Sequence, residues 1–233
     1  LHLRTVMASL GLFGDDEAEV NAEPKEADVF KYKGKITEQD KPLEMPDTSE
    51  SYEPQRLMKL LTQGKEMQEL FAIEALPTTA DTYGWQLAEP VATQLLTRLS
   101  HRMHDEEYTV AAARCVVDLA RLPVSTLSAA AAERCLLQPT LCAIDATLPR
   151  EYICCEWVHA LISLLPRLNR SALENSVLPY ALKHGDNSIS TPSRLLCCSL
   201  LGAVASAVGE GAFVERHVMM AALGFCQDIE LHV

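Results

Sequence analysis

The feature that most constrains the fold is a turn that recurs about every 41 residues through most of the chain. From residue 54 onward, apolar residues recur at helical spacing, and short polar segments interrupt them. Turns between paired helices are expected near Gly64, Asp105, Asp145, Asp186 and Asp228, which follow one another at this nearly constant spacing. The chain is therefore predicted to use one supersecondary unit repeatedly.

Each unit is predicted to contain two helices. The predicted pairs are 54–63 with 65–77, 86–103 with 106–121, 126–143 with 150–167, 171–184 with 192–208, and 213–226 with a helix that begins at 229. A period of about 40–47 residues is typical of HEAT or armadillo repeats, and two helices per unit favour HEAT. We expect an all-α HEAT-repeat α-solenoid of about 4.5 repeats over residues 54–233, truncated at its C-terminus because Val233 falls inside a predicted helix.

The positions of small residues and of acids support this repeat of helix pairs. Hydrophobic residues make up 48% of the chain and aromatic residues only 6%, a composition that favours close-packed helices over strands. Cys115, Cys155 and Cys197 each follow their predicted turn at nearly the same distance, and Ala75 follows Gly64 in the same way. We expect these small residues to be buried where paired helices approach, and the acids at the turns to cap the following helices.

Residues 1–53 are predicted to be an acidic tail of low order. Acids and prolines punctuate this segment, and it lacks the apolar period needed to bury a core.

The charge limits the class of partner. A formal net charge of −12 argues against nucleic acid and against an anionic membrane surface, since both attract clustered Lys and Arg. The eight cysteines and the absence of a credible signal peptide indicate reduced thiols and a cytoplasmic protein. Protein partners are expected.

The sequence offers no convergent catalytic or metal site. His101 with His104, and Cys155 with His159, are each spaced to supply two ligands, but zinc needs about four, so neither a metal nor a cofactor is expected. No nucleophile motif of the GxSxG kind is present, and a non-enzymatic protein is predicted. The two tryptophans, Trp85 and Trp157, are expected in the core rather than at a binding surface.

Stacked repeats place their intra-repeat turns along one edge, which is the predicted protein-binding surface. The residues expected on this turn edge are His104, Asp105, Glu106, Glu107, Leu148, Arg150, Glu151, His184, Asp186, Asn187, Gln227, Asp228 and Glu230.

Two segments near the C-terminus resemble a known family. The segments are SRLLCCSLLGAV (193–204) and GFCQDIELHV (224–233). The matching positions are Ser193, Arg194, Leu195, Cys198, Leu201 and Gly202, then Cys226, Gln227, Asp228, Ile229, Glu230 and Val233. This pattern resembles regulatory subunit 4 of protein phosphatase 4, a HEAT-repeat family related to the scaffold A subunit of protein phosphatase 2A. The resemblance covers about residues 54–233.

The resemblance implies a non-catalytic scaffold that binds a serine/threonine protein phosphatase catalytic subunit and targets it. In the related phosphatase 2A scaffold, partners bind along the intra-repeat turns, which favours the turn edge. An alternative is an architectural component of a large cytoskeletal or ciliary (axonemal) assembly that orders the tail. A third alternative, a tubulin-binding HEAT domain, would need basic residues and an exposed Trp on an edge that is mainly acidic here.

Overall fold

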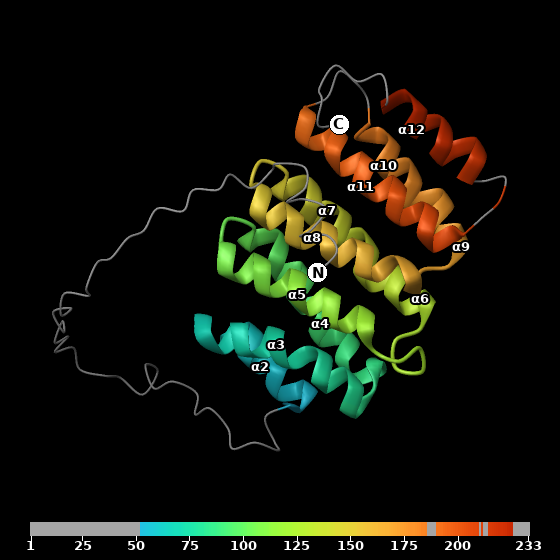
Figure 1. Cartoon of the computed structure of the whole chain (residues 1–233). Coiled ribbons are helices and arrows are strands. Elements are labelled where there is room, and N and C mark those ends of the chain that lie inside the picture. Colours follow the sequence, from blue (N-terminus) through green and yellow to red (C-terminus); the bar gives the residue numbers. More distant parts are fainter. Residues whose placement is uncertain (1–51, 186–189, 210, 212–213, 226–233) are drawn as a thin grey trace, which may run out of the picture. The chain divides into compact units, whose positions relative to one another are not determined.

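The computed structural model describes residues 52–185, 190–209, 211 and 214–225. The chain divides into two units, Leu1–Leu43 and Glu44–Val233, and every described residue belongs to the second. All regular elements in the described ranges are helical, with no strand among them (Figure 1). The predicted all-α class is confirmed, whereas the predicted tail lies almost entirely outside the described residues.

The helices form two layers (Figure 1). The first layer contains α2 (Pro54–Gln63), α4 (Trp85–Arg102), α6 (Ala129–Ala132) continued by η3 (Glu133–Leu137) and α7 (Gln138–Thr147), and α9 (Arg170–Ala172) continued by η5 (Leu173–Val177) and α10 (Leu178–Lys183). The second layer contains α3 (Glu66–Tyr83), α5 (Glu106–Arg121), α8 (Glu151–Leu164) with η4 (Leu165–Arg167), and α11 (Thr191–Val208). Finally, η6 (Val214–Met219) leads into α12 (Met220–Phe225) next to α11.

Contacts run mainly between neighbours. Within each pair, α2 packs on α3, α4 on α5, α7 on α8 and α10 on α11. Along the second layer, α3 contacts α5, α5 contacts α8, and α8 contacts α11. Along the first layer, α2 contacts α4, and α4 contacts η3. Each pair therefore packs on the described pair or pairs next to it.

The N-cap residues of the second-layer helices show how evenly the helix pairs are spaced along the sequence. They are Lys65, Asp105, Arg150 and Ser190, which recur at intervals of roughly 40–45 residues. The longest interval separates Asp105 from Arg150 and contains the long connection between α5 and α6. That connection runs from Leu122 to Ser128, whereas only Leu168 and Asn169 separate η4 from α9.

Local chemistry fixes several helix ends. Ser128 Oγ accepts a hydrogen bond from the Ala131 amide at 3.3 Å, and Asn169 Oδ1 accepts one from the Ala172 amide at 2.7 Å. Gly64 ends α2, where an added Cβ would lie 2.2 Å from the Leu60 carbonyl oxygen. Gly84 joins α3 to α4 at φ 85°, a conformation that favours glycine.

Two predicted turns, those near Gly64 and Asp105, are confirmed, and the one at Asp145 is wrong. Asp145 lies inside α7, which ends at Thr147, and the turn falls at Leu148–Arg150. Asp186 and Asp228 lie outside the described residues.

The predicted end of α3 at residue 77 is also wrong, because the helix passes through Pro77 and continues to Tyr83. Pro77 lacks the amide hydrogen that would donate a helical hydrogen bond. The packing of the last part of α3 offsets this loss, and there Thr79 Oγ1 donates to the Tyr52 carbonyl at 2.8 Å.

The cysteine register is correct in part. Cys115 and Cys197 are buried, as predicted, but Cys155 is only half-buried. The error follows from the predicted turn at Asp145. Because the helix α8 begins only at Glu151, Cys155 lies in its first turns and not at the buried position of Cys115. Counted ten positions from each N-cap, the equivalent residues are Ala75, Cys115, Ala160 and Leu200, and all four are buried.

The core confirms the prediction for the tryptophans. Trp85 is 6% exposed and Trp157 is fully buried. By length and composition, α11 is the one helix in the described ranges that could cross a membrane. It packs against α8 and α10 and carries the buried Arg194.

Replacing Trp157 with Ala should destabilise the fold by about 3–5 kcal/mol, because it leaves a large cavity beside α8. Tyr152 lies on the same helix and is 57% exposed, so Tyr152→Ala should change the free energy of unfolding by less than about 0.5 kcal/mol. Urea unfolding followed by circular dichroism measures both, and equal destabilisation would contradict this packing.

Candidate protein-binding site

The described part of the turn edge comes from three loops. His104 and Asp105 lie between α4 and α5, and Glu106 and Glu107 begin α5. Leu148 and Arg150 lie between α7 and α8, Glu151 begins α8, and His184 follows α10. Glu106, Glu107 and Tyr152 line one groove, so the structure brings the ends of the first two loops close together. Asp186, Asn187, Gln227, Asp228 and Glu230 lie outside the described residues.

Asp105 is the structural centre of the first loop. Its Oδ1 accepts a hydrogen bond from the Tyr108 amide at 3.0 Å, which confirms the predicted N-cap. Its Oδ2 pairs with the Arg102 guanidinium. Burial acts to raise the pKa of Asp105, but the Tyr108 amide and Arg102 outweigh it and hold the pKa below its usual value. Asp105 therefore stabilises the loop rather than standing free for a partner.

A partly buried ion network, which no sequence pattern indicated, lies behind this loop. The Glu69 side chain, only 6% exposed, pairs with Arg98 and Arg102. Arg102 also lies 4.4 Å from the centre of the Tyr108 ring. Burial acts to lower the pKa of Arg102, but the hydrogen bond to Asp105 and the charge of Glu69 raise it overall. The network ties α3, α4 and α5 together at the turn edge.

A second internal cluster involves His184. Its Nε2 lies 3.0 Å from Asp145 Oδ1, and the Tyr180 hydroxyl donates to the same oxygen at 2.8 Å. Burial and this hydrogen bond raise the pKa of Tyr180. Because His184 is 7% exposed, it joins α10 to α7 and offers little surface to a partner.

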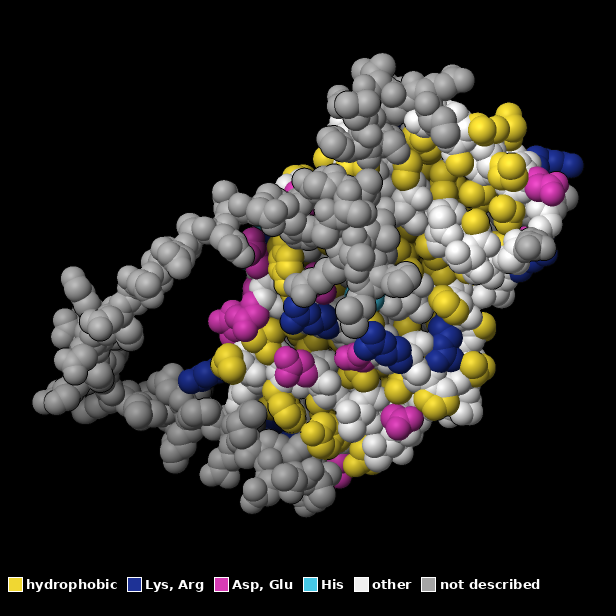
Figure 2. All heavy atoms as spheres, in the orientation of Figure 1, with side chains coloured by type: hydrophobic (Ala, Val, Ile, Leu, Met, Phe, Trp, Pro, Cys, Tyr) yellow, Lys and Arg dark blue, Asp and Glu magenta, His cyan; other side chains and the backbone are white. Residues whose placement is uncertain are grey.

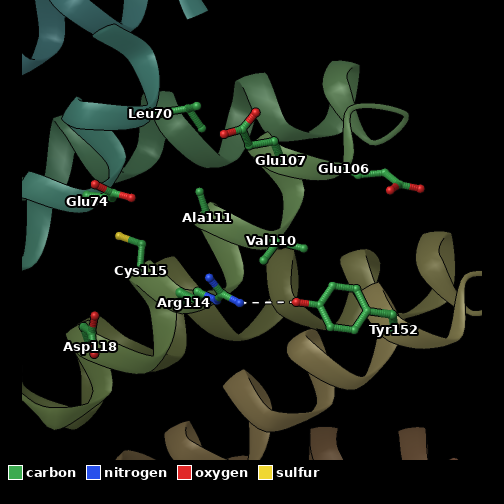
Figure 3. A pocket seen from close by; sticks show the side chains of 10 residues that line it. All are labelled: Leu70, Glu74, Glu106, Glu107, Val110, Ala111, Arg114, Cys115, Asp118 and Tyr152. Atoms are coloured by element: carbon green, nitrogen blue, oxygen red, sulfur yellow. Dashed lines mark hydrogen bonds between the residues drawn. The ribbon is translucent and has the colours of Figure 1, made fainter. Parts of the chain in front are cut away.

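A groove of about 630 Å³ opens on the second layer, between α3, α5 and α8. It is lined by Leu70, Glu74, Glu106, Glu107, Val110, Ala111, Arg114, Cys115, Asp118 and Tyr152 (Figure 3). The groove thus contains two predicted edge residues, Glu106 and Glu107, and extends from them along the helices.

The groove is acidic. Four carboxylates and one guanidinium line it, a formal net charge of −3. No ion pair joins Glu74, Glu106 or Glu107 to another residue in the described ranges, and all three are exposed. Asp118 pairs with Arg121 at 3.0 Å.

Arg114 is the single cation of the groove lining. Its guanidinium lies 3.6 Å from Glu156 and donates to the Tyr152 hydroxyl at 3.3 Å (Figure 3). This contact links α5 to α8 and leaves 61% of the Arg114 side chain exposed.

Sequence reasoning missed Glu74, Arg114, Asp118 and Tyr152 as parts of this surface. On α5 a signal was available, because Glu107, Ala111, Arg114 and Asp118 follow helical spacing along one face. No sequence signal placed Glu74 beside them.

The opposite layer has its own hollow, between α4 and the segment η3–α7. Its lining includes Thr93, Ser100, Met103, Gln138 and Cys142. Glu89 in this hollow pairs with Arg134 at 2.7 Å. The one carboxylate of this hollow is thus paired, unlike Glu74, Glu106 and Glu107 of the groove.

The buried thiols remain protonated near neutral pH. Burial raises the pKa of Cys154 and of Cys197 to about 12, and also raises that of Cys115. Within the described ranges, no three His, Cys, Asp or Glu side chains gather as a metal site.

Side chains of both charges also lie among hydrophobic ones on the face drawn in Figure 2. Exposed apolar side chains occur on the last described helical segment, where Met219, Met220 and Leu223 are 51%, 65% and 58% exposed.

No protein-family model, curated protein or solved structure matches the chain. The resemblance to the phosphatase 4 regulatory family stays an expectation from the sequence motif.

Asp105→Asn should keep the N-cap but lose the ion pair with Arg102, which costs on the order of 1 kcal/mol at pH 7. The folded-state pKa of Asp105 is lowered, so its stabilisation is present above the unfolded value of about 3.9 and is lost as the pH falls through the folded value. Urea unfolding from pH 7 to pH 3 should show the difference between wild type and variant shrinking below about pH 4.

The control is Asp118→Asn, which removes an exposed pair and should cost less than about 0.5 kcal/mol. A difference for Asp105→Asn that stays constant down to the lowest pH would contradict the assigned ion pair.

Proposed function

We propose that residues 54–233 form a HEAT-repeat α-solenoid that serves as a non-catalytic scaffold for other proteins. The proposal is supported by the recurrence of second-layer N-caps at intervals of roughly 40–45 residues. The packing of each helix pair chiefly on its neighbours is also typical of repeat proteins.

The single observation that carries the binding role is the acidic groove. Its side chains come from three successive second-layer helices, so it exists only because the units stack. Consecutive units of a solenoid create extended surfaces of this kind, and such surfaces bind proteins. The turn edge and the groove meet at Glu106 and Glu107, which makes one continuous candidate surface.

The proposed partner is a serine/threonine protein phosphatase catalytic subunit, which the scaffold would target in the cytoplasm. The resemblance to the phosphatase 4 regulatory family supports this partner. Of its motif residues, Ser193, Arg194 and Leu201 are buried in α11, so they support the repeat architecture rather than a contact surface.

The tubulin-binding alternative lacks the exposed Trp that it requires, because both tryptophans of the chain are buried. Neither can act as an exposed anchor on the turn edge.

The full chain should form a complex with purified phosphatase 4 catalytic subunit in analytical size-exclusion chromatography and in biolayer interferometry. Glu106→Lys with Glu107→Lys should weaken this complex at least about tenfold, because both charges lie on the proposed surface. The matched control, Glu53→Lys with Asp81→Lys, makes the same change of net charge at exposed positions outside the groove and should have little effect.

Absence of a complex at tens of micromolar, or equal weakening by the two double variants, would contradict the proposed partner or the proposed surface, respectively.

A further inference from the structure

We infer that the groove between α3, α5 and α8 binds an extended, basic peptide segment of another protein. The inference goes beyond the phosphatase scaffold, since it assigns a ligand chemistry to the groove whichever protein carries the peptide.

The shape of the groove suits an extended chain. It crosses three adjacent helices, and neighbouring packed helices are about 10 Å apart, so it spans roughly 20 Å. An extended peptide rises about 3.3 Å per residue, so roughly six residues would cross it.

The charge of the groove selects a basic peptide. Glu74 is contributed by α3, and Glu106 and Glu107 by the first turn of α5, while none of these three is engaged in an ion pair with another described residue. Lysine and arginine side chains would supply the missing counter-charges. An acidic peptide would meet like charge along α3 and α5.

Helix capping explains only part of this acidity. Glu106 and Glu107 lie at the N-terminus of α5, where the helix dipole stabilises acids. Glu74 lies in the middle of α3, and Asp118 lies in the last turn of α5, where the dipole disfavours an acid. The favourable end of the α5 dipole therefore accounts for Glu106 and Glu107 but not for Glu74 and Asp118.

The lining of the groove adds apolar contact. Leu70 and Cys115 are buried, Val110 and Ala111 are half-buried, and Tyr152 is 57% exposed at the α8 side. Figure 3 shows the side chains of Glu74, Glu107 and Asp118 placed around those of Ala111 and Cys115. Alternate side chains of an extended peptide could then reach the acids and these apolar groups, and Tyr152 could stack on a cation.

Arg114 gives the inference a distinctive consequence. Arg114 is a cation that lines a groove proposed to bind a basic peptide. It pairs with Glu156 and donates a hydrogen bond to Tyr152, so it competes with the peptide for both side chains. Removing its charge should strengthen the binding of a basic peptide, whereas a merely structural role for Arg114 would predict no change or a loss.

The test measures fluorescence anisotropy of a labelled six-residue peptide that alternates arginine with valine, titrated with the full chain at low salt. We expect saturable binding that weakens with added salt, and no binding of a matched peptide that alternates glutamate with valine. The triple variant Glu74→Gln, Glu106→Gln, Glu107→Gln should bind about tenfold more weakly. Arg114→Gln should bind more tightly, and Tyr152→Ala more weakly.

The control is Glu53→Gln, Asp81→Asn, Glu215→Gln, which removes the same number of exposed charges elsewhere and should stay within about twofold of wild type. Thermal unfolding by circular dichroism verifies that each variant is folded. Glu74→Gln alone, in the middle of a helix, is the fallback variant if the triple variant does not fold.

Equal weakening by the two triple variants, weaker binding by Arg114→Gln, or no saturable binding to wild type would overturn the inference without affecting the test with the phosphatase.

Discussion

A pair of helices cannot bury its apolar side alone, and this constraint explains most of the structure. Each second-layer helix is covered by its own partner and by the second-layer helices next to it. Small buried residues ten positions after the N-cap, such as Ala75, Cys115 and Ala160, allow this close approach. The proposed repeat architecture follows from that packing, and so does the groove, because stacking is what brings three helix faces together.

The polar groups divide into two kinds with different roles. Glu69, Arg98, Arg102 and Asp105 are paired with one another and hold the turn edge in place. In the groove, Glu74, Glu106 and Glu107 stay exposed and have no ion-pair partner among the described residues. A scaffold needs both kinds of charge. The paired charges keep the surface rigid, and the unpaired charges on that rigid surface can then bind a partner.

The sequence predicted the helix pairs well, because helical period and capping are local properties. Gly64 and Asp105 mark true ends for that reason. Asp145 was misread because its carboxylate bonds Tyr180 and His184, which are 35 and 39 residues away, and no local pattern distinguishes that role from capping. The groove was missed for the same reason: Glu74 and Tyr152 adjoin α5 only after stacking, so knowledge of the neighbouring faces is required.

The most direct test of the central claim is hydrogen–deuterium exchange of Leu57→Ala, measured by mass spectrometry on the full chain. Leu57 is fully buried in α2, at one end of the described stack. If the units interact mainly with their neighbours, amide exchange should accelerate strongly in α2 and α3 and remain close to wild type in α10 and α11. Uniform acceleration through all these helices would show a single cooperative core and would contradict the proposed repeat architecture.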